Sequence, residues 1–452
     1  MVLLEKAREI DVLTKVDICV IGGGTTGVMA AVRAARMGAK VAIVETQGNF
    51  GGNATSSLVC IWHTLLDFDF KQQIIAGLTQ EVLERLDKRN ALWTRDINRE
   101  GCPSRMNRIG TYVFNPQDLK IICDEMLQEE GVICCLHTRV CAPWIEDEKL
   151  KAVVVESKNG RQAIMADFFI DATGDGELAY RAGVPFVERD GKQPSTTAAV
   201  VRGYCDIDNP KKVLLDHLDE YGLPVMGWDV EYPKAPEIQV LCKTNVFDTP
   251  LTMEGMTAAE IEGRRQMKSI VDCLNKYGKG KKDVVLLGLS SYIGIREGRS
   301  MKGMYTMTGD DLNNGVSFPD AIGYGSYPSD IHHADKPGCT FSYLNGMSEY
   351  ERDGYPYEIK WWKEKSDDYP RYWQIPYRAL VPMEYDNLLV CGRGLSADRT
   401  AFGAIRVMVH LNQTGEAAGV AAALCLSEQV GNKELDIDLL RRKMAEGGSI
   451  IL

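Results

Sequence analysis

Three glycines near the N-terminus, Gly22, Gly24 and Gly27, have the spacing G-x-G-x-x-G. They follow a short apolar segment and open a segment of small residues with helical periodicity. In this setting the first glycine allows a tight turn, the second lets the backbone approach a pyrophosphate, and the third lets helix and strand pack closely. The N–H groups of the helix N-terminus, at Thr25 and Thr26, would then face the phosphates of a dinucleotide.

An acidic residue, Glu45, ends the next apolar segment, 18 residues after Gly27. A carboxylate at this place accepts hydrogen bonds from ribose hydroxyls and repels a 2′-phosphate. The pattern therefore favours FAD or NAD over NADP. A glycine-rich turn that binds nothing is the alternative, but the strand before the glycines and the helix after them favour a nucleotide site.

A second group of candidate residues lies in a turn-rich stretch that contains the adjacent histidines His332 and His333. Loops carry catalytic residues disproportionately, and the pKa of an unperturbed imidazole lies near neutrality. His332 is therefore the first choice for a catalytic acid or base, with a structural, hydrogen-bonded histidine as the alternative. No third ligand follows at a suitable spacing, so we expect no metal site.

Three arginines lie in short motifs of the same region and could bind an anionic or polyhydroxylated substrate. Arg296 and Arg299 belong to GIREGR, and Arg378 belongs to IPYR. Guanidinium groups bind carboxylates through paired hydrogen bonds, although many arginines form structural ion pairs instead. Tyr377 could donate a proton or merely pack, and His63 could face the reacting group.

Hydrophobic periodicity predicts the elements that position these residues. Residues 16–21 and 40–45 are expected strands around a helix at 27–37, which together form a right-handed parallel β-α-β unit. The small-residue composition of the helix suits close packing on a sheet. The expected fold class is therefore α/β, with a Rossmann-type parallel sheet.

Further elements follow between the two groups of candidates. Residues 71–90 and 116–130 have helical periodicity, and Asn115 is suited to cap the second helix. A strand is expected at 132–140, and the next two strands form a hairpin that turns at 159–160.

From about residue 190 the sequence becomes rich in Pro, Tyr, Trp and Gly, and the nucleotide-domain pattern returns near residue 386. A strand there runs into glycine, and an Ala/Gly-rich helix is expected at 404–426. We therefore predict a discontinuous cofactor domain that comprises residues 1–65, 115–188 and 385–452. A helical insertion is expected at 66–114, and an α+β substrate domain at 189–384.

Four widely separated motifs carry a resemblance to a known family: GGNAT, IDATG, GIREGR and CGRG, with DIH and IPYR between the last two. The chain resembles the FAD-dependent oxidoreductases with the glutathione-reductase-type flavoprotein fold. It is most similar to a bacterial group that carries GGxAT after the ribose-binding glutamate. The resemblance runs nearly from end to end and implies non-covalent FAD.

The resemblance also implies roles for single residues. Val140, at the end of its strand, would meet the adenine through its backbone. Arg393 stands where related flavoproteins often carry an aspartate that binds ribityl, a role that arginine cannot fill, so it could reach a phosphate instead. The 404–426 helix would point its N-terminus at flavin N1 and O2. The implied FAD site comprises Gly22, Gly24, Thr25, Thr26, Gly27, Glu45, Gly52, Asn53, Ala54, Thr55, Val140, Ala172, Thr173, Gly174, Gly392, Arg393, Gly403, Ala404 and Ile405.

The composition is that of an ordinary globular protein, with 452 residues, 45% hydrophobic and 25% charged, and a net charge of −11. No Lys/Arg run of the kind that grips phosphate backbones occurs, so we expect no nucleic-acid partner. No apolar stretch of about 18 residues and no signal-peptide core occur, which predicts no membrane span and a cytoplasmic location. The thirteen cysteines include no CxxC pair and are expected to be reduced.

Three functions remain open from the sequence. The first is a dehydrogenase or reductase that transfers hydride between a small polar organic substrate and flavin N5. The second is a redox-neutral flavoenzyme, an isomerase or lyase, and the third is a flavin electron-transfer subunit of a larger complex. Residues 189–384 contain no second G-x-G-x-x-G, so electrons would come from the substrate, from NAD(P)H in the substrate cavity, or from a redox partner. The oligomeric state stays open, a homo-oligomer included.

Overall fold

The predicted β-α-β unit is present at the start of the chain. The computed structural model describes residues 3–4, 7–95, 111–189, 191–224, 227–280, 282–334 and 338–452. In it, β1 (Asp11–Ile21) and β2 (Val41–Val44) are parallel neighbours, and α1 (Thr25–Arg36) connects them. The turn from β1 into α1 requires a φ of +100° at Gly22, a conformation that glycine adopts readily.

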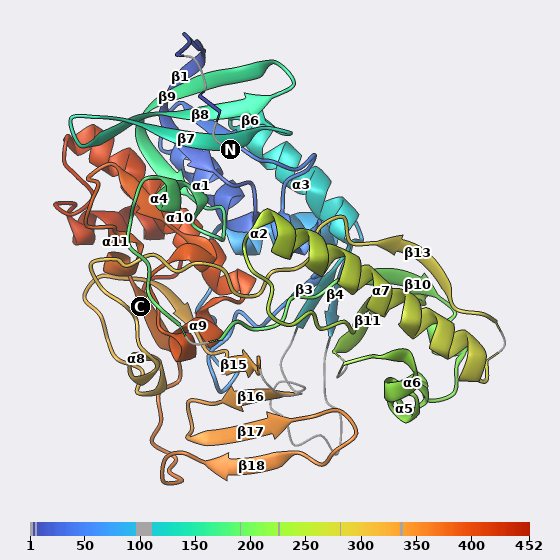
Figure 1. Cartoon of the computed structure of the whole chain (residues 1–452). Coiled ribbons are helices and arrows are strands. Elements are labelled where there is room, and N and C mark those ends of the chain that lie inside the picture. The colour runs from blue at the N-terminus through green and yellow to red at the C-terminus, as the bar shows by residue number, and fades with distance from the viewer. Residues whose placement is uncertain are drawn as a thin grey trace.

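Five more strands extend this unit into a seven-stranded sheet at one end of the molecule (Figure 1). β6 (Ile133–Cys135), β9 (Gly160–Asp171) and β20 (Leu388–Val390) continue its parallel part. β8 (Lys149–Ser157) and β7 (Arg139–Glu146) pair antiparallel, because short turns join β7, β8 and β9. The predicted parallel sheet is therefore a mixed sheet, within a mixed α/β fold.

Two local predictions, a hairpin and a helix cap, are confirmed. The hairpin turn lies at residues 158–159, one residue before the predicted position, between Ser157 of β8 and Gly160 of β9, which face each other across it. The helix α3 (Pro116–Glu129) is capped by Asn115, whose Oδ1 accepts a hydrogen bond from the Gln117 N–H at 2.9 Å. Both features depend on residues that are close together in the sequence.

Two elements were predicted too long. The strand expected at 132–140 is interrupted by His137, which takes a left-handed φ of +52° and separates β6 from β7. The helix expected at 71–90 is only α2 (Leu78–Lys88), which begins after Gly77 at a φ of +64°.

The helix expected at 404–426 is also wrong, because it is two helices. α9 (Arg399–Ile405) is capped by Asp398, whose Oδ1 accepts a hydrogen bond from the Ala401 N–H at 2.8 Å. Val407 then takes an extended conformation with a ψ of 132°, and α10 (Met408–Glu428) begins after it. The N-terminus of the long helix therefore lies at Met408.

The predicted helical insertion at 66–114 contains strands as well as α2. β4 (Leu92–Arg95) and β5 (Thr111–Phe114) pair with each other, and β5 pairs with β3 (Ile61–Trp62). Residues 96–110 of the predicted insertion lie outside the described residues.

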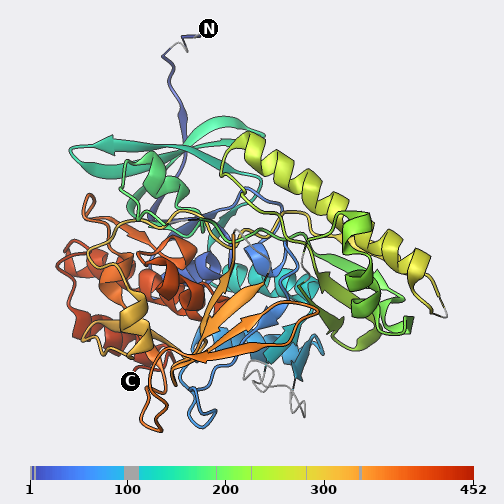
Figure 2. The ribbon, with the colours of Figure 1, turned by 60° about the horizontal axis from the view of Figure 1, so that its bottom comes forward.

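The middle of the chain forms smaller antiparallel sheets, of which β15–β18 lies at the opposite end of the molecule from β7 and β8 (Figure 1). The long helix α7 runs along one edge (Figure 2). The elements are β10 (Ala199–Arg202), α5 (Pro210–Asp216), α6 (Leu218–Tyr221), β11 (Trp228–Tyr232), β12 (Ala235–Cys242), α7 (Met253–Tyr277), β13 (Val285–Leu289), α8 (Gly309–Asn313), β14 (Ala321–Gly325), β15 (Ser329–His332), β16 (Cys339–Ser342), β17 (Met347–Glu351), β18 (Glu358–Trp361) and β19 (Trp373–Pro376).

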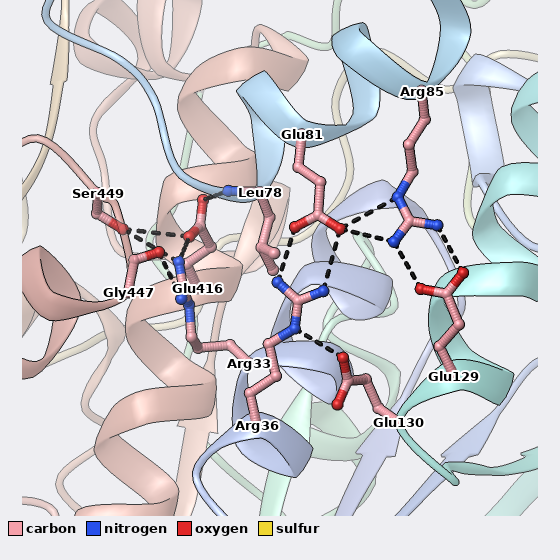
Figure 3. Close-up of polar contacts among 10 residues, drawn as sticks. All are labelled: Arg33, Arg36, Leu78, Glu81, Arg85, Glu129, Glu130, Glu416, Gly447 and Ser449. Carbon is pink, nitrogen blue, oxygen red and sulfur yellow. Dashed lines mark hydrogen bonds and ion pairs between the residues drawn. The ribbon is translucent and has the colours of Figure 1, made fainter. Parts of the chain in front are cut away.

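The long helix α10, in the C-terminal part of the chain, packs directly against α1. Gly415 and Gly419 allow this close approach. A Cβ at Gly415 would lie 2.2 Å from the Thr26 carbonyl oxygen, and one at Gly419 would lie 2.3 Å from the Ala30 carbonyl oxygen. Buried Arg33 of α1 reaches Glu416 of α10, and segments far apart in the sequence meet there (Figure 3). The remaining helices are α4 (Glu177–Arg181) and α11 (Ile437–Glu446).

Cysteines and helix hydropathy add two observations on the described residues. Their cysteines are free, and most of those thiols are buried. None of their helices combines the length and apolar character that crossing a membrane requires.

Candidate functional site

The three motif glycines have different neighbours. A Cβ at Gly22 would lie 2.6 Å from the Ala172 carbonyl group, and one at Gly27 would lie 1.9 Å from the Gly22 carbonyl oxygen. A Cβ at Gly24 would meet nothing within 4 Å, at the N-terminus of α1. Gly22 and Gly27 thus serve packing, whereas Gly24 faces open space beside N–H groups that no intrahelical acceptor satisfies. This arrangement fits the pyrophosphate of a dinucleotide.

Glu45 lies directly beside this turn. Its Oε2 accepts a hydrogen bond from the Gly23 N–H at 2.7 Å, and its Oε1 accepts one from the Gln47 N–H at 2.8 Å. The side chain is partly exposed. Each carboxylate oxygen can accept more than one hydrogen bond, so Glu45 keeps the capacity to bind ribose hydroxyls.

The GGNAT segment lies against the first turn. The Gly51 N–H donates to the Gly23 carbonyl oxygen at 2.8 Å, and a Cβ at Gly52 would lie 2.9 Å from Gly24 Cα. Asn53 lines a cavity, and its Nδ2 donates to the Ile295 carbonyl oxygen at 3.3 Å. Ala54 and Thr55 are buried, with Thr55 Oγ1 donating to the Phe50 carbonyl oxygen at 2.8 Å, so they support the loop from behind.

The predicted segments at 172–174 and 392–393 meet each other. Gly174 takes a φ of +80°, and a Cβ there would lie 2.7 Å from Nη2 of Arg393. Arg393 forms an ion pair with Asp175 at 3.3 Å and also lines the cavity. The Gly392 N–H donates to Thr414 Oγ1 of α10 at 3.1 Å. Asp175 is thus the partner that sequence reasoning did not name for Arg393.

Other predicted cofactor residues lie elsewhere than expected. Val140 is the second residue of β7, buried and opposite Val155, and does not end a strand. Gly403, Ala404 and Ile405 are buried near the C-terminal end of α9, and a Cβ at Gly403 would lie 2.7 Å from Ser329 Oγ. These three residues therefore pack against β15, and the helix N-terminus expected there is formed by Val407 and Met408, which line the cavity.

A cavity of about 620 Å³ brings together residues from separate segments of the chain. At its charged part, Asp330 accepts hydrogen bonds from Arg406 Nη2 at 2.8 Å and from the Tyr327 hydroxyl at 3.2 Å. Burial acts to raise the pKa of Asp330, but His332 and Arg406 outweigh it and hold that pKa well below its usual range. Asp330 is therefore a carboxylate at neutral pH, fixed by its partners.

His332 lies beside this carboxylate, with Nε2 3.5 Å from Asp330 Oδ1. Burial, assisted by the charge of Arg296, lowers the pKa of His332 to about 4. The expectation that its pKa would lie near neutrality is therefore wrong, and the imidazole is neutral at pH 7. His63 also lines the cavity, where burial lowers its pKa to about 4, and its ring lies tilted by 44° against that of Tyr327 with centroids 4.3 Å apart.

Glu351 is a candidate functional residue of the cavity that the sequence analysis did not identify. His332, Cys339 and Glu351 are paired in register across β15, β16 and β17, and all three line the cavity. Residues opposite each other share a face of the sheet, with Cβ atoms about 5 Å apart. Burial and the charge of Glu349 raise the pKa of Glu351 to about 7. Only strand register reveals this residue, since no local motif surrounds it.

Three of the predicted catalytic residues do not line the cavity. Arg299 Nη1 donates to the Asp175 carbonyl oxygen at 3.3 Å, and the guanidinium lies 4.1 Å from the Tyr180 ring. The buried Tyr377 donates its hydroxyl to the Asn432 carbonyl oxygen at 3.0 Å. Arg378 forms paired hydrogen bonds with Asp320, at 2.9 and 3.1 Å. These contacts give the three side chains partners within the protein, and Arg296 and His332 are the predicted catalytic candidates that line the cavity.

No group of three or more His, Cys, Asp or Glu side chains in the described ranges has an arrangement that could hold a metal ion.

Comparison with known proteins gives a family and distant structural relatives. Residues 17–444 match the family described as FAD dependent oxidoreductase, whereas the search of curated proteins finds no match. A geranylgeranyl bacteriochlorophyll reductase-like protein from Thermoplasma acidophilum is 11% identical, with a TM-score of 0.48 over 96% of this chain and 84% of that chain. L-proline dehydrogenase from P.horikoshii is 14% identical, with a TM-score of 0.38 over 97% of this chain and 100% of that chain.

A p-nitrophenol 4-monooxygenase from Pseudomonas putida is 11% identical, with a TM-score of 0.44 over 95% of this chain and 85% of that chain. Structural likeness at this distance does not bear on the reaction. The family match covers most of the chain and agrees with the glycine-rich turn, so this chain is an enzyme of the FAD-dependent oxidoreductase family, with FAD as its cofactor.

Proposed function

We propose that this enzyme holds FAD non-covalently and transfers hydride between a small polar organic substrate and the flavin. Bound FAD supplies a hydride acceptor or donor at N5. The observation that carries the proposal is the position of the cavity. It is lined by Asn53 and Arg393 from the predicted cofactor segments, by Met408 at the start of α10, and by Arg296 and His332.

The cavity lies between two of the domains that we propose. Asn53, Arg393 and Met408 belong to the Rossmann-type FAD domain that we propose for residues 1–65, 115–188 and 385–452. Arg296 and His332 belong to the proposed substrate domain at 189–384. A cavity lined from both sides would hold the substrate between the cofactor and the polar groups of the second domain.

Different residues of this chain would then stabilise negative charge and transfer a proton. The positive end of α10, at Val407 and Met408, favours negative charge on the group beside it. Asp330 orients His332, and His332 accepts or returns a proton of the substrate at a ring nitrogen.

The first test is an anaerobic titration of the purified protein with NADH and NADPH, followed through the flavin absorption band. Rapid bleaching would identify a reductase that admits nicotinamide to the cavity. A flavin that stays oxidised would indicate reduction by the enzyme's own substrate or by a redox partner. A protein that neither purifies with FAD nor binds added FAD would contradict the proposal.

Gly24→Ala tests the cofactor position directly. The added methyl group meets no protein atom within 4 Å, so the fold should tolerate it, whereas a pyrophosphate at the α1 N-terminus should not. We expect a folded protein, by circular dichroism, that has lost FAD. Gly288→Ala, at a position equally free of neighbours, is the matched control and should retain FAD. Full flavin content in Gly24→Ala would refute the site.

A further inference from the structure

Most charged side chains that line the cavity have a partner of opposite charge. Lys243 pairs with Asp229 at 2.6 Å, and Lys211 pairs with Asp353. The arginines Arg406 and Arg393 pair with Asp330 and Asp175, as described above. Charges set below a protein surface are normally neutralised in this way, because an isolated charge loses hydration without compensation.

Arg296 is different. Within the described part of the chain it has no carboxylate at ion-pair distance, and Nη1 donates to the Pro194 carbonyl oxygen at 2.5 Å. Burial, assisted by the charge of Arg406, lowers the pKa of Arg296 to about 10, so the guanidinium remains charged at neutral pH. A guanidinium has five N–H donors, and most of those of Arg296 are left for a ligand.

Building on the proposed function, we propose that the substrate carries a carboxylate and that Arg296 binds it. The planar fork of a guanidinium matches the two oxygens of a carboxylate. The other lysines and arginines that line the cavity, Arg352 excepted, pair with carboxylates of the chain, so one carboxylate of a ligand would match the charge of Arg296. Arg352 also lines the cavity, but its guanidinium lies 4.1 Å from the ring of the exposed Tyr355.

Binding of the carboxylate would also act on His332. The positive charge of Arg296 is the second cause, after burial, of the low pKa of His332. A bound carboxylate offsets that charge and raises the pKa of His332, which makes the imidazole a better proton acceptor once the substrate is present. Arg296 would thus bind the substrate and also couple its arrival to proton transfer.

The test uses pairs of probes that differ in charge and hardly in shape: benzoate with benzamide, and acetate with acetamide. Each is titrated into the FAD-loaded enzyme and into the FAD-free protein, with binding measured by calorimetry and, in the loaded enzyme, by the flavin difference spectrum. We expect a carboxylate to bind about 10- to 100-fold more tightly than its amide.

Variants at Arg296 locate the effect. Arg296→Met should lose roughly 10- to 100-fold in carboxylate affinity and abolish the preference over the amide. Arg296→Lys keeps the charge without the fork and should fall between the two. Arg442→Met makes the same change at an exposed position of α11 and should bind as the unmodified enzyme does.

Three results would overturn the assignment. They are equal affinity for carboxylate and amide in the unmodified enzyme, tighter binding of inorganic phosphate than of either carboxylate, and an unchanged carboxylate preference in Arg296→Met. Failure of the proposed function would look different, since FAD retention and flavin reduction are measured without these probes. An enzyme that binds carboxylates through Arg296 but never exchanges hydride would refute the function and support the carboxylate site.

Discussion

Two arginines set below the surface, Arg33 and Arg296, have opposite surroundings. Arg33 of α1 meets the carboxylate of Glu416, and its Nη1 donates to the Gly447 carbonyl oxygen at 2.8 Å. Glu416 in turn accepts the Leu78 N–H at 3.1 Å, so α1, α2, α10 and the C-terminal segment join at one ion pair (Figure 3). Arg296 has no such carboxylate among the described residues and faces a cavity.

The presence or absence of a carboxylate partner distinguishes a charge that stabilises the fold, at Arg33, from a charge that is available to a ligand, at Arg296. A buried ion pair is costly to break, because removal of one partner leaves the other charge desolvated and unpaired. An unmatched charge in a cavity costs stability, and a bound anion can compensate for it. Each prediction below changes one side of this comparison.

The largest effect is expected at the buried pair. Glu416→Ala leaves Arg33 charged and unpaired in the core, where both side chains are at most 5% exposed. We expect a loss of about 3–5 kcal/mol in the free energy of unfolding, measured by urea denaturation. A loss below about 1 kcal/mol would show that the pair does not hold these helices together.

Arg296→Met should weaken carboxylate binding without lowering the free energy of unfolding appreciably. Carboxylate affinity should fall, but the free energy of unfolding should stay within about 1 kcal/mol of the unmodified value or rise, because an unmatched charge is removed. Urea denaturation and calorimetry on the same preparation measure both quantities. A loss of stability comparable to that of Glu416→Ala would make Arg296 a structural residue.

Carboxylate affinity should depend on pH through Glu351. Its pKa is raised to about 7 by burial and by the negative charges of Glu349, Asp330 and Asp353, against the opposing charge of Lys211. Below pH 7 the side chain is protonated and neutral. As the pH rises through 7 it becomes anionic, cancels part of the positive surplus of the cavity, and weakens carboxylate binding.

Neither Arg296 nor His332 titrates in that window, since their pKa values are about 10 and 4. We expect a several-fold loss of benzoate affinity between pH 6 and pH 8, and a flat profile for Glu351→Gln. The contribution of Glu351 to the free energy of unfolding also falls as the pH rises. Its folded-state pKa is raised, so the folded state loses stability as the pH rises from about 4.5 to 7. An unchanged slope in Glu351→Gln would exclude this residue as the cause.

The smallest effect is expected at the outer ion pairs of Figure 3. Glu129 accepts hydrogen bonds from Arg85, and its side chain is 48% exposed. Because water screens such pairs, Glu129→Gln should change the free energy of unfolding by less than about 1 kcal/mol. A larger loss would show that this outer network acts together with the buried pair.

Features encoded by neighbouring residues could be predicted from the sequence. The glycine-rich turn, the Asn115 cap of α3 and the β8–β9 hairpin each depend on a few adjacent residues whose conformational preferences act locally. Periodicity was less reliable at boundaries. Nothing in residues 132–140 indicates the left-handed conformation of His137, and the helix that Asp398 caps before residue 404 was not predicted from the sequence.

The roles of the charged residues could not be predicted in the same way. Arg296, Arg299 and Arg378 are equivalent as residue types in short motifs, yet two of them are engaged by protein partners. Partners such as Asp175 and Asp320 come from distant parts of the chain, and Glu351 joins the cavity through strand register. Coulomb interactions and desolvation depend on distances in space, so only the folded chain decided which charge is neutralised and which is left for a ligand.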